Sequence, residues 1–117
     1  MNNADFTQLV EETFRQTQQL LRVKGGEYSN DQDRLANFSR AALLTGMPRL
    51  SVAFVYLSKH YDAISREVQD RAAGITREKS ESLEGRIHDL INYCLLLKAI
   101  IREDDGFAFD DDDDEEI

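Results

Sequence analysis

The chain has 117 residues, which is enough for one domain with one hydrophobic core but too few for two. Its formal charge of −9 is unevenly distributed: residues 103–117 contain ten acids and no base, whereas all 14 Lys and Arg lie in residues 1–102 together with 13 of the 23 acids. The body is therefore nearly neutral, and we do not expect direct binding to nucleic acid. We expect no secretion signal, because the first residues lack a basic region followed by an apolar core, and no membrane span, because no apolar run approaches the roughly 20 residues that one needs. With Cys94 as the single cysteine, a reducing cytoplasm without membrane attachment is expected.

Apolar residues recur at helical spacing in four segments, and no strand pattern competes with them. The first segment covers residues 5–24, and we expect Gly25-Gly26 to end it with a left-handed cap. The second begins near Asp31 or Asp33, either of which can serve as an N-cap, and stops before Gly46. These two helices are the first half of an all-α fold.

The third and fourth helices carry wider apolar surfaces than the first two. The third is predicted from Pro48 to Gly74 and the fourth from a cap at Ser80 or Ser82 to about residue 102. From Leu90 onward the fourth helix is apolar nearly all round, which is typical of a helix at the centre of a bundle or at a subunit interface. The sequence therefore predicts a compact four-helix bundle-like domain that forms homo-oligomers.

The acidic end of the chain has a different composition from the rest. We expect residues 1–103 to form the helical domain and residues 104–117 to form a disordered acidic tail, because so few apolar groups cannot offset chain entropy. Phe107 and Phe109 precede the acidic run and are candidate anchors for a partner protein. One interpretation is that the tail occupies a basic groove on a DNA-binding partner, and the other is that it only keeps the protein soluble.

The start of the fourth helix holds the densest group of polar residues. Glu81, Glu84, His88 and Asn92 follow helical spacing along one face, and Asp89 lies one turn before Asn92. Carboxylates arranged in this way can hold Mg²⁺, which prefers oxygen ligands. The alternative is that Glu81 and Glu84 only complement the helix dipole. Asp89 and Asn92 lie among apolar residues, where polar side chains need partners.

Two further groups are candidates for nucleotide contacts. Lys59 and His60 lie in the middle of the third helix, where Lys59 can contact a phosphate and His60 can act as a hydrogen-bond donor or base. Lys24, Tyr28 and Asn37 lie near the first loop and can reach a nucleotide if that loop folds over the bundle. Gly25-Gly26 lacks the spacing of a phosphate-binding loop, which excludes the P-loop and Rossmann classes.

Taken together, these groups resemble small phage-encoded helical proteins of the nucleotide modification associated domain and, more distantly, the MazG-type all-α nucleoside triphosphate pyrophosphatases. The similarity spans about residues 20–101 and consists of short motifs in a fixed order. These motifs are Lys24-Gly-Gly-Glu-Tyr28, Arg34-Leu-Ala-Asn37-Phe38, Lys59-His60 and Asp89-Leu-Ile-Asn92-Tyr93.

The resemblance implies an oligomeric helical protein that binds a nucleotide or a nucleotide-derived small molecule, and, for a phage-encoded chain, a location in the host cytoplasm. Asp89 matches the acid of the final helix, Asn92 the amide one turn later, and Lys59 the basic residue of the preceding helix. Gly85 departs from the pattern, since related sequences tend to have an acid there.

Two nucleotide functions follow from this resemblance. The first is Mg²⁺-dependent pyrophosphohydrolysis, with Glu81, Glu84 and Asp89 as catalytic metal ligands. The second is non-catalytic binding or sequestration of a nucleotide, which the glycine at position 85 favours.

Overall fold

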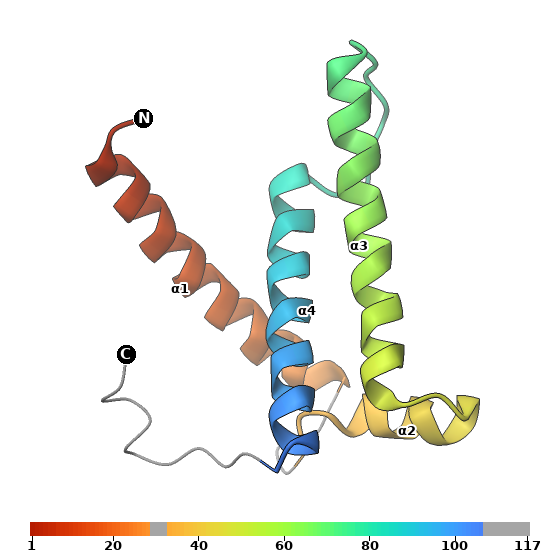
Figure 1. Cartoon of the computed structure of the whole chain (residues 1–117). Coiled ribbons are helices and arrows are strands. Elements are labelled where there is room, and N and C mark those ends of the chain that lie inside the picture. The colour runs from red at the N-terminus through yellow and green to blue at the C-terminus, as the bar shows by residue number, and fades with distance from the viewer. Residues whose placement is uncertain (29–32, 107–117) are drawn as a thin grey trace.

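The computed structural model describes the backbone of residues 1–28 and 33–106 and the side chains of residues 1–23 and 33–106. Within these ranges the chain is all-helical and contains no strand, as predicted. The helices are α1 (Asn3–Tyr28), α2 (Ala36–Thr45), α3 (Arg49–Ala72) and α4 (Leu83–Asp104) (Figure 1). No single helix of the described residues is long and apolar enough to cross a membrane; α2 and α3 pass that test only as a pair bent by 104°.

Side chains and glycines fix most of the helix ends. The Oδ1 atom of Asn2 accepts a hydrogen bond from the Asp5 N–H at 2.8 Å, and Ser82 Oγ accepts one from the Gly85 N–H at 3.0 Å. Gly46 follows α2 with φ of 71°, in the left-handed region that residues with a Cβ rarely adopt. The predicted stops at Gly46 and Gly74 and the predicted cap at Ser82 are thereby confirmed.

Three predicted boundaries differ from the structure. The prediction that Gly25-Gly26 ends the first helix was wrong, because α1 continues to Tyr28; two glycines cost helix stability, roughly 1 kcal/mol each, but do not force a break. The second helix begins at Ala36, since Asp33 caps a preceding turn by accepting the Leu35 N–H at 2.9 Å. At the other end, α4 includes Asp104, which had been assigned to the tail. Residues 107–117 lie outside the described residues.

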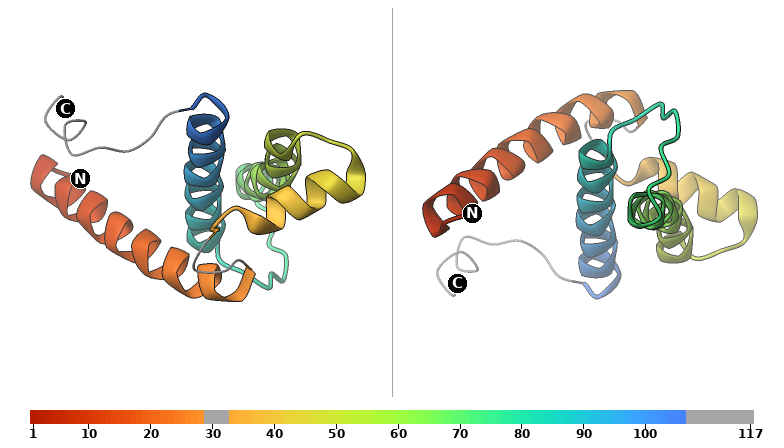
Figure 2. Two further views of the ribbon diagram at one scale, coloured as in Figure 1. Left: turned by 90° about the horizontal axis from the view of Figure 1, so that it is seen from below. Right: turned by 90° about the horizontal axis from the view of Figure 1, so that it is seen from above.

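The helices surround α4. It lies between α1 and α3 in all three views, and α2 crosses beneath the first turns of α3 (Figures 1 and 2). The α3 and α4 helices pack side by side, whereas α1 leans away so that its N-terminal half points outward. The two faces of α4 are therefore covered unequally, and apolar residues such as Leu95 and Ile101 stay exposed although the helix is apolar nearly all round.

The hydrophobic core is small. Five apolar residues of the described ranges are buried, and they come from the segments around α2, the start of α3 and the end of α4: Leu35, Phe38, Val52, Ala53 and Ile100. Many large apolar side chains remain exposed, among them Phe6 and Phe14 on α1 at 57% and 64% of their surface. The described core thus holds α2, α3 and α4 together and leaves the outer part of α1 with little apolar cover.

An ion-pair cluster joins the start of α3 to the end of α4. The Nη2 atom of Arg49 lies 2.9 Å from Asp104 Oδ1 and 3.1 Å from Glu103 Oε1. The hydrogen bond that Arg49 donates to Asp104 is the main cause that raises the pKa of Arg49 above its ordinary value. The last turn of α4 is therefore fixed to α3 by charge as well as by the core.

Candidate functional site

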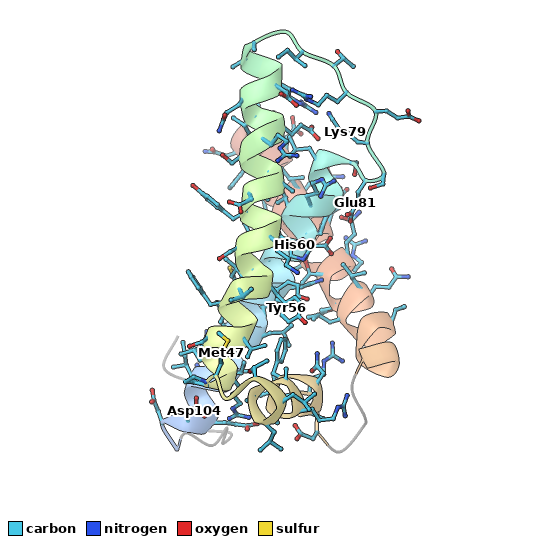
Figure 3. All side chains as sticks on the ribbon, turned by 90° about the vertical axis from the view of Figure 1, so that its right-hand side faces the viewer. Met47, Tyr56, His60, Lys79, Glu81 and Asp104 are labelled. Atoms are coloured by element: carbon cyan, nitrogen blue, oxygen red, sulfur yellow. The ribbon has the colours of Figure 1, made fainter. Side chains whose placement is uncertain are left out.

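Two of the short motifs meet between α3 and α4. The Nδ1 atom of His60 lies 3.8 Å from Asp89 Oδ2, and the His60 ring stacks on Tyr93 with the ring centroids 5.0 Å apart. Tyr56, one turn before His60, also stacks on Tyr93 at 6.2 Å. The Lys59-His60 motif of α3 thus faces the Asp89–Tyr93 motif of α4, although the two are distant in sequence (Figure 3).

A third motif reaches the same place from α2. The ring of Phe38 packs edge-on against Tyr56 at 6.3 Å and against Tyr93 at 6.5 Å. Such edge-to-face pairs add to the energy of burial and fix ring orientation. The aromatic residues therefore form a wall that positions His60 opposite the carboxylate of Asp89.

Two buried polar residues of α4 lie beside this wall. Asp89 and Asn92 are each only 4% exposed and one helical turn apart. Among the described residues, neither the amide nitrogen nor the amide oxygen of Asn92 has a hydrogen-bond partner, and both atoms are shielded from solvent. An unpaired buried polar group costs about 1–3 kcal/mol, so most such groups in proteins have a structural or functional reason. Asn92 is the clearest unexplained polar residue of this site.

A pocket of about 460 Å³ opens between α1 and the start of α4. All three predicted acids, Glu81, Glu84 and Asp89, line it, and α1 contributes Gln16 and Leu20 to the opposite wall. A second hollow of about 270 Å³ continues along the same two helices. The volume of the first pocket is within the range of small-molecule sites, and its predicted acids are therefore brought together around one space.

His88 belongs to this pocket, although the sequence did not single it out as a binding residue. It lines both hollows, and its Nδ1 atom is buried with no hydrogen-bond partner in the part of the chain that the structure describes. Helical spacing from Glu81 and Glu84 was the available signal. Gly85 lines the pocket as well, where a Cβ atom would lie 3.1 Å from Ser82 Oγ and 3.4 Å from Glu81 Cγ. An acid at position 85 would therefore crowd the helix cap and the pocket wall.

The pocket acids are the candidate ligands of the predicted Mg²⁺. No three His, Cys, Asp or Glu side chains in the described part of the chain are placed so that they can hold one ion together. Mg²⁺ needs near-octahedral oxygen geometry but supplies several ligands as water. The three acids surround the pocket without converging on a point, and Mg²⁺ binding stays a prediction.

The other predicted residues whose side chains the structure describes do not line the α1–α4 pocket. Lys59 is exposed, with its Nζ atom 5.2 Å from the centroid of the Tyr56 ring, and it does not line the α1–α4 pocket. Asn37 is half-buried in the first turn of α2. The side chains of Lys24 and Tyr28 lie outside the described residues, so their predicted roles stay predictions.

Comparisons with known protein families, curated proteins and solved structures found no match to this chain. Within the structure itself, the motifs that contain Phe38, His60 and Asp89 converge on one region between α2, α3 and α4. Asp89 also lines the α1–α4 pocket, so it joins the aromatic wall to the acidic pocket.

Proposed function

We propose that this chain is a nucleotide-binding protein whose ligand occupies the pocket between α1 and α4. The observation that carries the proposal is the buried polar pair of α4, in which Asp89 lines the pocket and Asn92 is buried one helical turn away. A carboxylate accepts hydrogen bonds, and an amide both donates and accepts them, so the pair suits the polar edge of a base or sugar. On the α3 side of Asp89, the His60–Tyr93 stack holds His60 opposite this carboxylate.

The acidic lining favours the nucleoside part of the ligand over its phosphates. Glu81, Glu84 and Asp89 would repel phosphate oxygens but accept hydrogen bonds from amino and hydroxyl groups. Non-catalytic binding is therefore the form of the proposal that the geometry supports better. Pyrophosphohydrolysis, with the same three acids as metal ligands, is the alternative.

Calorimetry with a panel of nucleosides and nucleoside triphosphates, each with and without Mg²⁺, tests the proposal. Asp89→Asn keeps the shape of the side chain and removes its charge. We expect it to weaken binding by about tenfold, since a hydrogen bond to a charged group is worth roughly 1.5–3 kcal/mol. Recovery of unaltered ligand would identify binding without catalysis, whereas release of pyrophosphate would identify the hydrolase.

Asp62→Asn is the matched control, because Asp62 is an exposed aspartate of α3 that does not line the pocket. It should leave the affinity unchanged. Equal affinities for the wild type and both variants would place the ligand elsewhere, and the absence of binding to every compound would remove the proposal.

We also propose that the chain associates with copies of itself. Exposed apolar residues on α1 and on the outer side of α4, such as Phe14 and Leu95, favour this arrangement. We separately propose, from the sequence, that the acidic residues 107–117 bind a protein partner. These residues lie outside the described ranges.

A further inference from the structure

A second pocket, of about 240 Å³, lies on the other side of the α4 start, between the C-terminal half of α3 and the connection that follows it. Four cationic residues line it: Arg66 on α3, Arg77 and Lys79 in the connection, and Arg86 on α4. Its carboxylates are Glu67, Asp70 and Glu78. This cationic pocket contrasts with the acidic pocket, although residues 80 and 81 of the two linings are adjacent in sequence.

Two of the four cations form ion pairs with acids of the pocket. Arg77 Nε lies 2.8 Å from Asp70 Oδ2, and Lys79 Nζ lies 3.0 Å from Glu67 Oε1. Both acids are buried, so these pairs offset the cost of placing charge inside the fold. Glu67 has a further partner in Arg71, which lies 3.1 Å away. The buried acids of the pocket are thus fully compensated by charge.

The side chains of the other two cations, Arg66 and Arg86, make no hydrogen bond or ion pair with the residues that the structure describes. Each guanidinium has five N–H donors in a planar fork and stays charged at all physiological pH values. Two guanidinium groups on different helices therefore approach one pocket in which the buried acids Glu67 and Asp70 are already paired and four cations face three carboxylates. This arrangement attracts an anion with several oxygen acceptors.

We propose that the cationic pocket is a binding site for phosphate groups, and that its ligand is a small molecule with a di- or triphosphate, held by Arg66 and Arg86. Arginine forks match phosphate oxygens in a bidentate manner. The pocket is below the usual size of a site for a whole drug-sized molecule, which favours the phosphate part of a ligand. This inference is independent of the proposed nucleoside site at Asp89 and Asn92.

Titration of the full chain with tripolyphosphate, in low salt without Mg²⁺, tests this site directly. The double variant Arg66→Gln/Arg86→Gln removes both unpaired guanidinium groups and keeps the Arg77 and Lys79 pairs. We expect its Kd for tripolyphosphate to rise by about tenfold or more. The double variant Arg15→Gln/Arg22→Gln removes the same charge from exposed positions of α1 and should bind as the wild type does.

Equal weakening in the two double variants would overturn the proposal, because it would show a diffuse charge effect. Failure of millimolar tripolyphosphate to bind the wild type would overturn it too, as would binding of a single-stranded oligonucleotide with no binding of tripolyphosphate. Far-UV circular dichroism of both variants verifies their fold. Tripolyphosphate has no base or sugar, so its binding does not depend on Asp89. Asp89→Asn should therefore leave the Kd for tripolyphosphate unchanged. This result distinguishes failure of the cationic pocket from failure of the nucleoside site.

Discussion

At the scale of single residues, Asn92 is a buried polar side chain that we expect to destabilise the fold. A side chain whose polar atoms are buried and unpaired destabilises the fold, and an apolar side chain of similar shape removes that cost. We expect Asn92→Leu to increase the free energy of unfolding by about 1–2 kcal/mol and to abolish nucleotide binding. Chemical denaturation without ligand, together with calorimetry, measures the two effects.

Asn92→Asp provides the contrast at the same position. It keeps the shape but adds a buried charge one turn from Asp89, so it should lower stability. If Asn92→Leu is instead less stable than the wild type, Asn92 is a structural residue and the proposed site loses its main support.

At the scale of elements, ion pairs hold the connection between α3 and α4 against α3. Burial opposes ionisation of Glu67, but the hydrogen bonds and charges of Lys79 and Arg71 outweigh it and hold the pKa of Glu67 below its ordinary value of 4.5. A carboxylate with a lowered pKa in the folded state stabilises the fold above its unfolded pKa, and this contribution is lost as the pH falls through the folded pKa. The ion pairs of Glu67 should therefore matter at neutral pH and lose their effect in acid.

Glu67→Gln tests this dependence. The variant should unfold at a lower temperature than the wild type at pH 7, and the difference should shrink as the pH falls below 4.5. Thermal unfolding followed by circular dichroism across this pH range gives the comparison. Glu11→Gln, at an exposed position of α1, serves as the control and should match the wild type throughout; a pH-independent loss in Glu67→Gln would contradict the explanation.

Ion pairs also hold the end of α4 against the start of α3. Asp104, which pairs with Arg49 of α3, lies in the segment that the sequence assigns to the tail. We expect deletion of residues 107–117 to leave the unfolding temperature nearly unchanged, because the sequence predicts few native contacts there. Deletion of residues 104–117 should cost about 0.5–1 kcal/mol more, the usual value of a partly exposed ion pair.

Comparison of the two truncated chains by calorimetric melting measures this difference. Equal stability of the two would show that the Arg49–Asp104 pair contributes nothing. A fall of several degrees on removal of residues 107–117 alone would mean that these residues pack on the body.

At the scale of the whole molecule, the exposed apolar surface predicts self-association. Single chains rarely expose so many large apolar side chains on adjacent helices, and α1 contributes Phe6, Leu9 and Phe14. Light scattering at micromolar concentration should give at least twice the mass of one 13.4 kDa chain. Phe6→Ser/Phe14→Ser should shift the mass toward the monomer, whereas Glu11→Ser/Arg15→Ser on the same helix should not. A monomeric wild type would refute the prediction.

The sequence by itself determined the helical class and most helix ends, because these depend on local chemistry. Periodic apolar residues, the Ser82 cap and the left-handed Gly46 and Gly74 act within a few residues of their own positions. The sequence also selected the three acids that line one pocket. The Gly25-Gly26 break was predicted from the same local chemistry and was wrong, since a glycine permits a helix end without imposing one.

The tertiary structure decided which side chains share a space. Spacing along α4 does not show that Asp89 faces His60, that Asn92 is buried without a partner, or that Arg66 and Arg86 line a common pocket. These relations depend on how α3 and α4 are rotated and displaced against each other, which is set by packing between segments far apart in sequence. Local chemistry fixes the helices, whereas long-range packing fixes the sites between them.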